Sequence, residues 1–454
     1  MIRAAVRFLD ERTGGAPLAR KALRYVFPDH WSFLLGEVAL YSFVVLVATG
    51  VYLTFFFEPS TAQTVYHGSY APLQGTRMTE AYRSTLDISF DVKAGLLIRQ
   101  THHWAANLFI VSIVLHLLRV FFTGAYRKPR ELTYLIGVTM LMLALLEGYV
   151  GYSLVDDLLS GMGLAIGYAV LVSVPFVGAN LALLLFGGPF PGDTDLWPRL
   201  YIAHVLLLPV AIGTLLALHL LLVASRHHTQ FRGTNRRVVG MPAFPAYAPR
   251  TLGLLLSVAA VLVLLGGLAQ INPIWLWGPY HVDAGTNGAQ PDWYLGWLIG
   301  GLRLVPSFDV RIGGLTLVPN PFWAGALFPT FVFGVAALHP FAERRLTRDR
   351  ERHHLLDRPR DRPWRTAFGC AFLTWVTLIF FAGSADRVFI ALGFSYEGQV
   401  RVYRWLVLIL PVVVFLVARG MCDELRRSGV RPLRGGPPAV ARRRPDGAFE
   451  DVGR

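Results

Sequence analysis

Charged residues and cysteines are both scarce in this 454-residue chain. Only 16% of the residues are charged and 54% are hydrophobic, whereas an average soluble domain carries about 25% charged residues. This balance excludes an ordinary soluble enzyme and a disordered protein. The two cysteines, Cys370 and Cys422, form no metal-spaced or haem-attachment motif and are too few for a disulfide scaffold. Recurrent apolar runs of about 18 residues or more instead indicate a membrane protein.

Eight of these runs predict transmembrane helices, so we expect an all-α integral membrane protein. Four of them precede residue 225 and four follow it, and the four-helix bundle that the first four form is the candidate cofactor-binding part. The eight runs lie near residues 33–57, 96–122, 132–153, 201–224, 252–272, 322–341, 366–383 and 402–419.

The distribution of charge decides how a ninth apolar run, residues 164–186, is interpreted. A net charge of +14 would suggest nucleic acid for a soluble protein, but in a membrane protein lysine and arginine mark the cytoplasmic side. With eight spans, most of the 43 Lys and Arg residues fall on one side, and no nucleic-acid partner is expected. A ninth span would move the later Arg-rich segments outside. We therefore expect residues 164–186 to lie at the outer interface, broken at Pro175 and Gly178.

The same distribution of Lys and Arg predicts a multi-pass protein of the bacterial plasma membrane, with both termini in the cytoplasm. A basic N-terminal arm covers residues 1–32, and an Arg-, Pro- and Gly-rich tail, residues 421–454, is expected to be disordered. Between them lie an N-terminal lobe, 33–224, and a C-terminal lobe, 225–420. The Arg-rich loop 342–365 is expected to face anionic membrane lipids.

Histidines on the second and fourth spans form a matched pattern. His102 and His116 are fourteen residues apart, which at about 100° per residue returns them to within about 40° of one helix face. His204 and His219 are fifteen apart and return to within about 60°. His103 lies about 140° from His116 and is assigned to hydrogen bonding or proton relay. Histidines inside spans are costly, so this pattern predicts a function.

Two bis-histidine haems explain this pattern. At about 1.5 Å per residue, the histidines on each helix are about 21 Å apart. Both helices run from outside to inside, so they offer one histidine pair near each membrane surface. A haem iron takes two axial ligands, one from each side of the porphyrin. Four matched histidines therefore predict two b-type haems stacked across the bilayer.

Glycines and arginines accompany these histidines. A flat macrocycle between helices needs neighbours without a Cβ, although ordinary helix packing also uses glycine. Arginines near the histidines could hold haem propionates, although arginine at a helix end also snorkels to the interface. The glycines are Gly36 with Gly50 and Gly137 with Gly151, each pair fourteen residues apart; the arginines are Arg99, Arg119 and Arg199.

Between the fifth and sixth spans, Pro291-Asp292-Trp293-Tyr294 resembles the Pro-Glu-Trp-Tyr signature of the cytochrome b subunit of the cytochrome bc1/b6f family. Together with the histidine and glycine pairs, this motif extends the resemblance over residues 30–420. Residues 84–91 and 156–161 are similar to the actinobacterial branch. Val155 departs from the family, which usually has proline after the Gly-Tyr-x-Leu that here is residues 151–154.

The resemblance implies a quinol–cytochrome c reductase subunit working by the Q cycle. His102 and His204 would hold an outer, low-potential haem, and His116 and His219 an inner, high-potential haem. Both haems would be non-covalent, because no cysteine stands near the start of the first span. The implied partners are a Rieske iron–sulfur protein, a c-type cytochrome, a second copy in a homodimer and a terminal cytochrome oxidase. The implied substrate is a quinol, with menaquinone suggested by the actinobacterial branch.

Two acids have alternative interpretations. Asp292 would line the outer quinol site together with Tyr294 and the 149–163 segment, which includes Gly163. In this site Asp292 would accept a proton from the quinol. Alternatively, Asp292 would only cap the helix that follows. Glu147 would accept a quinol proton or pair locally with a neighbouring helix. The inner quinone site is poorly marked, with His30, Arg226, His227, His228 and Arg250 as candidates.

Two other classes of protein remain as alternatives. One is a di-haem membrane anchor of another respiratory dehydrogenase, although such anchors typically have fewer spans. The other is a cofactor-free transporter that uses its histidines for proton relay.

Overall fold

The computed structural model describes residues 2–192, 195–231, 237–285, 291–428, 440–443 and 449–451. Among them, eight helical segments are long and apolar enough to cross a membrane, which confirms the predicted number of spans. They are α3 (Leu34–Thr54) with the preceding turn η1 (Trp31–Phe33), α5 (Gly95–Thr123), α6 (Glu131–Ser153), α9 (Leu196–Ile202) continuing through η3 (Ala203–Leu207) into α10 (Leu208–Arg226), η4 (Ala243–Tyr247) with α11 (Ala248–Leu268), η7 (Trp323–Leu327) with α13 (Phe328–Thr347), α14 (Pro363–Ala382) and α15 (Tyr396–Arg427).

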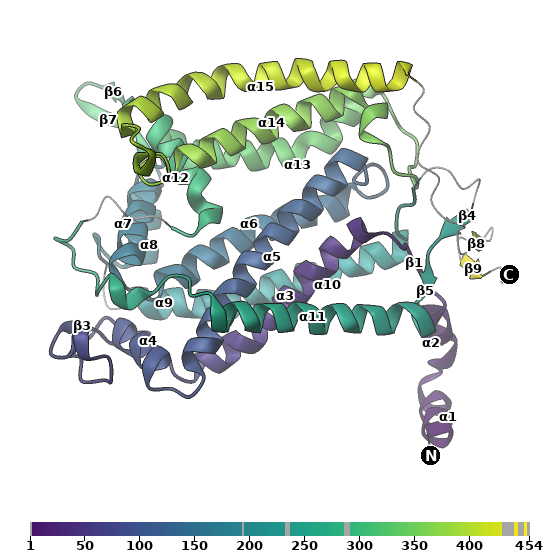
Figure 1. The fold of residues 1–454 in the computed structure, drawn as a ribbon, viewed down its shortest axis with the longest axis horizontal. Coiled ribbons are helices and arrows are strands. Elements are labelled where there is room, and N and C mark those ends of the chain that lie inside the picture. The colour runs from purple at the N-terminus through teal and green to yellow at the C-terminus, as the bar shows by residue number, and fades with distance from the viewer. Residues whose placement is uncertain are drawn as a thin grey trace.

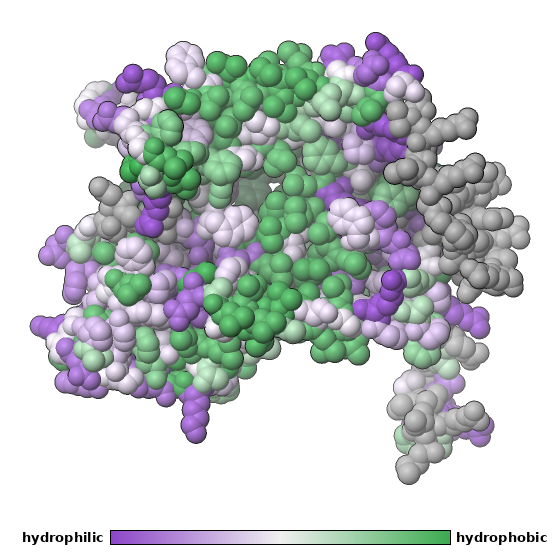
Figure 2. Space-filling model, in the orientation of Figure 1, coloured by the Kyte–Doolittle hydropathy of each residue, from purple (hydrophilic) through white to green (hydrophobic). Residues whose placement is uncertain are grey.

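The spans run roughly side by side (Figure 1). Figure 2 shows a hydrophobic band across the middle of the molecule, with hydrophilic residues at both sides of it. We call the end with α2 (Ala16–Leu23), β1 (Val26–Phe27) and β5 (Met241–Pro242) the inner end, after the charge-based prediction. The end with α4 (Glu80–Phe90) is the outer end. In Figure 1, α1 (Ile2–Thr13) projects away from the helices at the inner end.

Among the described residues, two of the spans contain a π-helical turn, and in each case a proline follows at the start of the next helix. The turns are η3 and η7, and the prolines are Pro209 and Pro329. The segment η4 is instead kinked, because Phe244 has an extended backbone (φ −129°, ψ 139°). Proline has no backbone N–H and cannot make the regular bond to the preceding turn. A π turn inserts one extra residue into the helix and often occurs at functional sites.

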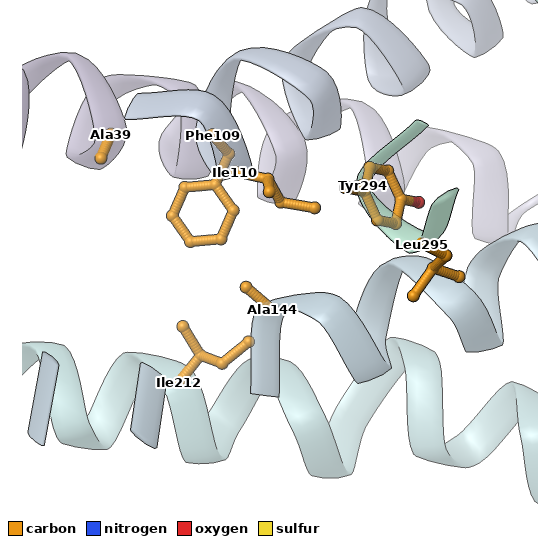
Figure 3. Packing of buried hydrophobic residues seen from close by; sticks show 7 residues of the cluster. All are labelled: Ala39, Phe109, Ile110, Ala144, Ile212, Tyr294 and Leu295. Atoms are coloured by element: carbon orange, nitrogen blue, oxygen red, sulfur yellow. The ribbon is translucent and has the colours of Figure 1, made fainter. Parts of the chain in front are cut away.

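An apolar middle layer packs the first four spans together. Phe109 and Ile110 of α5 face Ala144 of α6 and Ile212 of α10, with Ala39 of α3 beside them (Figure 3). Ile110, Ala144 and Ile212 are almost fully buried. Because lipid tails are as apolar as these side chains, close van der Waals packing rather than exclusion from water holds such a layer together.

The second set of spans is not a separate bundle. α11 packs on α3 and α5 of the first four spans, whereas α14 packs on α15 and on the short helix α12 (Gly296–Leu304). Helix α13 contacts α6. The division into lobes at residue 225 therefore remains a prediction about the chain, with α11 lying against the first set.

The ninth apolar run forms two short helices rather than a span. α7 (Leu158–Val172) is capped by the Asp157 side chain, and α8 (Gly178–Phe186) begins after a break that contains Pro175. Phe176 in this break is 93% exposed. The helices are therefore interrupted where the sequence predicted.

Short strands and turns complete the ends of the molecule. Antiparallel pairs are β1 with β5, β2 (Gln63–Val65) with β3 (Arg77–Thr79), and β6 (Val310–Ile312) with β7 (Leu315–Val318). β4 (Arg237–Val239), β8 (Val440–Arg443) and β9 (Phe449–Asp451) form a three-stranded sheet. Of the predicted tail, residues 421–427 continue α15, and residues 440–443 and 449–451 form β8 and β9. The other tail residues after 428 lie outside the described part of the chain.

Candidate functional site

The outer pair of predicted haem ligands consists of two imidazoles that face each other across a narrow gap. His102 lies in α5 and His204 in the π turn η3, with ring centroids 6.1 Å apart and ring planes at 76°. Two metal–nitrogen bonds of about 2 Å each fit between imidazoles at this separation. The pair therefore suits the two axial positions of one haem iron.

The second ring nitrogen of each outer histidine is held by the protein. His102 Nδ1 is 2.9 Å from Thr49 Oγ1, and His204 Nδ1 is 2.9 Å from Glu147 Oε1. Such partners orient a ligating imidazole and leave its Nε2 free for the metal. Glu147 thus pairs locally with His204, which favours the second of its two interpretations.

The inner pair lies further along the same helices, His116 on α5 and His219 on α10. His219 Nδ1 is 3.1 Å from the backbone carbonyl of Thr133, again leaving Nε2 free. His116 Nδ1 is buried without a hydrogen-bond partner in the described part of the chain. The apolar middle layer separates this inner level from the outer one.

Each of the four histidines faces one of the four predicted glycines. A Cβ at Gly50 would lie 3.3 Å from His102 Cε1, and a Cβ at Gly36 would lie 3.3 Å from His116 Cε1. A Cβ at Gly151 would press against the His204 ring, whereas one at Gly137 would be 3.9 Å from His219, an ordinary contact. The glycines therefore keep the space around the imidazoles open.

Two of the three predicted propionate-binding arginines lie partly buried beside these histidines. Arg99 lines the cavity of the outer pair, and Arg119 lies with its guanidinium 4.0 Å above the Phe33 ring. The Nε and Nη2 atoms of both arginines are buried without partners among the described residues. Buried, unpaired guanidinium groups are costly, and a carboxylate of a bound group would satisfy them.

Arg199 is placed differently from the prediction. Its side chain is 41% exposed and pairs with Asp195 at 3.3 Å, four residues earlier on the helix. It also donates to the backbone carbonyls of Leu184 and Leu185. Because these groups hold the guanidinium at the surface, Arg199 does not line the cavity of the outer pair.

A cavity that is partly open to the surface surrounds the outer histidine pair. Its lining includes His102 and His204 together with Asp292, Tyr294 and Glu147. The predicted haem ligands and the predicted quinol-site residues therefore share one space.

The Asp292 carboxylate is held by two side chains within this cavity. Its Oδ1 is 2.8 Å from His103 Nε2, and its Oδ2 accepts a hydrogen bond from the Tyr294 hydroxyl at 2.9 Å. Its side chain makes no capping bond to the turn η6 (Trp293–Leu295) that follows. The helix-cap interpretation is therefore not supported, and His103 makes a hydrogen bond, as its position on the helix predicted.

The 149–163 segment forms part of the wall, although not through every residue predicted. Tyr152, Leu154 and Val155 line the cavity, so valine occupies the wall where the family usually has proline. Gly163 lies behind this surface, where its carbonyl accepts a hydrogen bond from Tyr149 at 3.3 Å.

Two buried aspartates follow this wall at the outer end. Asp156 has a left-handed backbone, φ 60°, and its Oδ2 accepts a 2.6 Å hydrogen bond from Thr79. Burial, with a smaller contribution from the adjacent Asp157 carboxylate, raises the pKa of Asp156 to about 7, and the hydrogen bond from Thr79 partly opposes this rise. This carboxyl therefore changes charge near neutral pH.

Several of the inner-site candidates gather around aromatic rings. His228 Nδ1 is 2.9 Å from the Tyr25 hydroxyl, and the ring of His30 lies 4.6 Å from that of Phe231. Burial, together with the nearby charge of Arg119, lowers the pKa of His228 to about 4.

Of the remaining inner-site candidates, His227 is partly buried and the two arginines lie at the surface. The His227 ring stacks on Tyr25 at 5.6 Å. Arg226 is exposed, and Arg250 pairs at the surface with Asp29 at 3.2 Å.

Comparisons with known proteins agree with this geometry. The family model described as "Cytochrome b(N-terminal)/b6/petB" matches residues 107–279. The cytochrome bc1 complex cytochrome b subunit of Streptomyces coelicolor is 46% identical over 98% of this chain and 82% of that protein. The corresponding subunit of Mycobacterium leprae is 44% identical over 98% of this chain and 81% of its own length.

The fold also resembles a solved structure titled "Hyperthermophilic respiratory Complex III". The two share a TM-score of 0.67 at 19% sequence identity, covering 91% of this chain and all of the other. At this identity the likeness concerns the fold alone.

The eight spans define an integral membrane protein, and the facing pair His102 and His204 suits one of the cytochrome type. The chain belongs to the family of cytochrome b subunits of the cytochrome bc1 complex, and the two relatives named above are actinobacterial. It is therefore a subunit of a respiratory oxidoreductase complex whose family uses haem b. Neither a dehydrogenase anchor nor a cofactor-free transporter agrees with this membership.

Proposed function

We propose that this subunit oxidises a quinol at the outer cavity and carries electrons across the membrane through two b haems. His102 and His204 would hold the outer haem, and His116 and His219 the inner one. When bound, each haem would accept and release one electron. One observation carries this proposal: the rings of His102 and His204 face each other, with centroids 6.1 Å apart, in the cavity that Asp292 and Tyr294 also line.

The protein groups have distinct roles around these haems. Thr49, Glu147 and the Thr133 carbonyl orient the imidazoles. Arg99 and Arg119 offer unpaired, buried N–H groups to the propionates.

Asp292 is the proposed proton acceptor for the quinol. Its two oxygens are fixed by His103 and Tyr294, so one lone pair on each remains available toward the cavity. Oxidation of a quinol releases two protons and two electrons. Asp292 would take a proton from a quinol hydroxyl and release it at the outer side, which is general-base catalysis in a positioned geometry.

The second electron and the partners complete the proposal. One electron would pass to a Rieske iron–sulfur protein and a c-type cytochrome. The other would pass to a quinone at the inner end, near His30, His228 and Arg119, as in a Q cycle that adds to the proton gradient. The complex would be a homodimer in the plasma membrane, using menaquinone and able to associate with a terminal cytochrome oxidase.

Single histidine variants test the haem assignment. His102→Ala should leave one b haem of two in the purified subunit, because the outer iron loses an axial ligand. His103→Ala is the matched control, since the adjacent histidine faces Asp292 instead, and it should retain both haems. Reduced absorbance spectra and haem extraction measure the stoichiometry. Loss of a haem in His103→Ala but not in His102→Ala would contradict the assignment.

Purification of the whole complex under mild detergent tests the partners. A Rieske protein and a c-type cytochrome should accompany this subunit and support quinol-dependent cytochrome c reduction. A preparation that contains two b haems but neither partner, and shows no such activity, would favour a different di-haem membrane protein.

A further inference from the structure

A carboxylate that has no part in the roles above lies inside the membrane at the inner end of α3. The side chain of Glu37 accepts hydrogen bonds from the Tyr247 hydroxyl at Oε1 and from the Thr251 hydroxyl at Oε2, the latter at 2.6 Å. The Tyr41 hydroxyl lies 3.4 Å from Oε2 and also bonds Thr251. Acids within spans are rare and usually serve a function, because burying their charge is costly.

The chemistry of this cluster suits proton transfer. Its three described partners are all hydroxyl groups, each able both to donate and to accept a hydrogen bond. An arginine in contact would keep Glu37 ionised, and none of the ion pairs formed by the described residues includes Glu37. A change of protonation at Glu37 would therefore not leave the cation of a broken ion pair unpaired.

One side of the cluster faces the inner histidine level. Gly36, the residue before Glu37, would place a Cβ 3.3 Å from His116 Cε1. The Tyr247 ring stacks face to face on the Phe27 ring with centroids 4.0 Å apart, and the centroids of the Phe27 and His228 rings are 5.5 Å apart. Glu37 therefore lies next to the inner haem position and beside the aromatic group proposed for the quinone.

The other side of the cluster faces the inner surface. Thr251 follows Arg250, which pairs with Asp29; their side chains are 61% and 51% exposed. Water thus reaches the residue next to the cluster. The titratable and charged groups around Glu37 are Tyr41 and Tyr247 in contact, His116 and His228 toward the site, and Arg250 with Asp29 toward water.

We propose that Glu37, with Tyr247 and Thr251, conducts protons from the inner surface to the quinone that is reduced at the inner end. This inference rests on the proposed function and assigns that site its proton supply. Reduction of a quinone to a quinol uses two electrons and two protons, and an O–H bond forms at each ring oxygen. The electrons are those that the proposed function delivers to the inner site.

Each turn of the relay balances. Protonated Glu37 releases its carboxyl proton for one O–H bond, and the hydroxyls around it stabilise the carboxylate that remains. A proton from water at the inner surface then returns through the Thr251 side and restores the acid. The second O–H bond uses a second turn.

The Glu37→Gln variant of the complete complex tests this relay, because glutamine keeps the size and hydrogen bonding but carries no acidic proton. Both b haems should remain, and quinol should reduce them through the outer site at the wild-type rate. Reoxidation of the inner haem by added quinone, followed by stopped-flow absorbance, should be about 100-fold slower or more, the usual effect of removing one positioned acid. The same step should be slowed by deuterium oxide in the wild type.

Glu131→Gln is the matched control. Glu131 is also a carboxylate at the inner end of a span, on α6, but it lies 3.8 Å from Arg344 and away from this cluster. Its variant should reoxidise at the wild-type rate.

Two outcomes would overturn the relay. Wild-type reoxidation in Glu37→Gln would leave Glu37 as a hydrogen-bonded link between α3 and α11. If Glu37→Gln fails to assemble, Tyr247→Phe keeps the carboxylate and removes one donor, and an unchanged rate there would count equally against the relay. A wild-type complex whose inner haem is not reoxidised by quinone would instead contradict the proposed function itself.

Discussion

A single carboxylate shows how far residue identity determines the outer site. Asp before an apolar helix is a common N-cap, so the sequence around Asp292 is compatible with either a cap or a base. In the structure its oxygens meet His103 and Tyr294, and neither reaches the backbone of η6. Contacts between distant segments of the chain, which residue spacing does not encode, distinguish the two.

Replacing Asp292 with asparagine should slow quinol oxidation about 10²–10⁴-fold, the range for a positioned base. Asparagine keeps the size and much of the hydrogen bonding, so both haems should remain bound. Steady-state quinol turnover, with reduced haem spectra on the same sample, measures the effect.

Asp292→Glu is the conservative control, because it restores a carboxylate with one more methylene, as in the commoner family motif. It should keep much of the activity. Turnover of Asp292→Asn within about twofold of wild type would refute the base assignment, against the expected factor of 10² or more.

Asp156 gives a prediction about stability and pH. Its folded-state pKa is about 7, whereas the pKa of an unfolded aspartate is about 3.9. The folded state therefore holds the proton more tightly, so the free energy of unfolding falls as pH rises from about 4 to 7 and stays lower above that range. At about 1.4 kcal/mol per pKa unit, the loss is on the order of 4 kcal/mol.

Asp156→Asn should remove this loss, because asparagine does not ionise and tolerates the left-handed backbone. The variant should unfold at a higher temperature than wild type at pH 8 and at a similar one at pH 4, in thermal melts in detergent. A constant difference between the two proteins across this pH range would contradict the prediction.

At the residue scale, spacing predicted the four histidines as ligands, and the structure places the predicted glycines opposite them, because helix geometry alone relates those positions. It did not identify Thr49 or Thr133, whose contacts with the imidazoles come from neighbouring helices. It also misplaced Arg199, because a nearby Asp195 and two free carbonyls hold that side chain at the surface.

At the scale of helices, one π turn explains an irregularity in the histidine spacing. His204 and His219 are fifteen residues apart, one more than the other pairs. The turn η3, residues 203–207, includes His204, and a π turn accommodates one extra residue. The π turn therefore takes up the extra residue next to His204. As a result, His204 and His219 can both lie on the helix face that meets His102 and His116 of α5.

Deletion of Leu206 should therefore retain both haems, because a regular turn would replace the π turn and leave a fourteen-residue spacing. Deletion of Ile113 from α5 is the matched control, since it leaves His102 and His116 thirteen residues apart and about 140° out of line. The haem-to-protein ratio of the purified variants measures both. Loss of a haem on deletion of Leu206, with none lost on deletion of Ile113, would refute this explanation.

Helix ends were predicted less well than helix cores. The apolar pattern of the last span stops near residue 419, whereas α15 continues to Arg427. Hydropathy detects the part of a helix that lies in lipid, and backbone hydrogen bonding carries the helix beyond it into charged sequence. The break between α7 and α8 was predicted because proline and glycine act locally.

At the scale of the whole molecule, the number of spans fixes which loops share a side. Reporters fused after Arg237 or after Arg350 should be cytoplasmic, and one near Gly285 should be external, because the positive-inside rule places the Arg-rich segments within. Enzymatic reporters active on only one side of the membrane measure this. An external reporter at Arg237 would mean that residues 164–186 cross the membrane.

The apolar middle layer has an electrical consequence. The space between the two histidine levels is filled by Ile110, Ala144 and Ile212. Their side chains are apolar and cannot bind a proton. An electron transferred between haems at those levels would cross this insulating slab unaccompanied by a proton, so it would do work against the membrane voltage. That work is at most about 2.3 kcal/mol for each 100 mV. A membrane voltage that is negative inside should therefore oppose electron flow from the outer level to the inner level. The same voltage should favour electron flow from the inner level back to the outer level, as for charge moved between the plates of a capacitor.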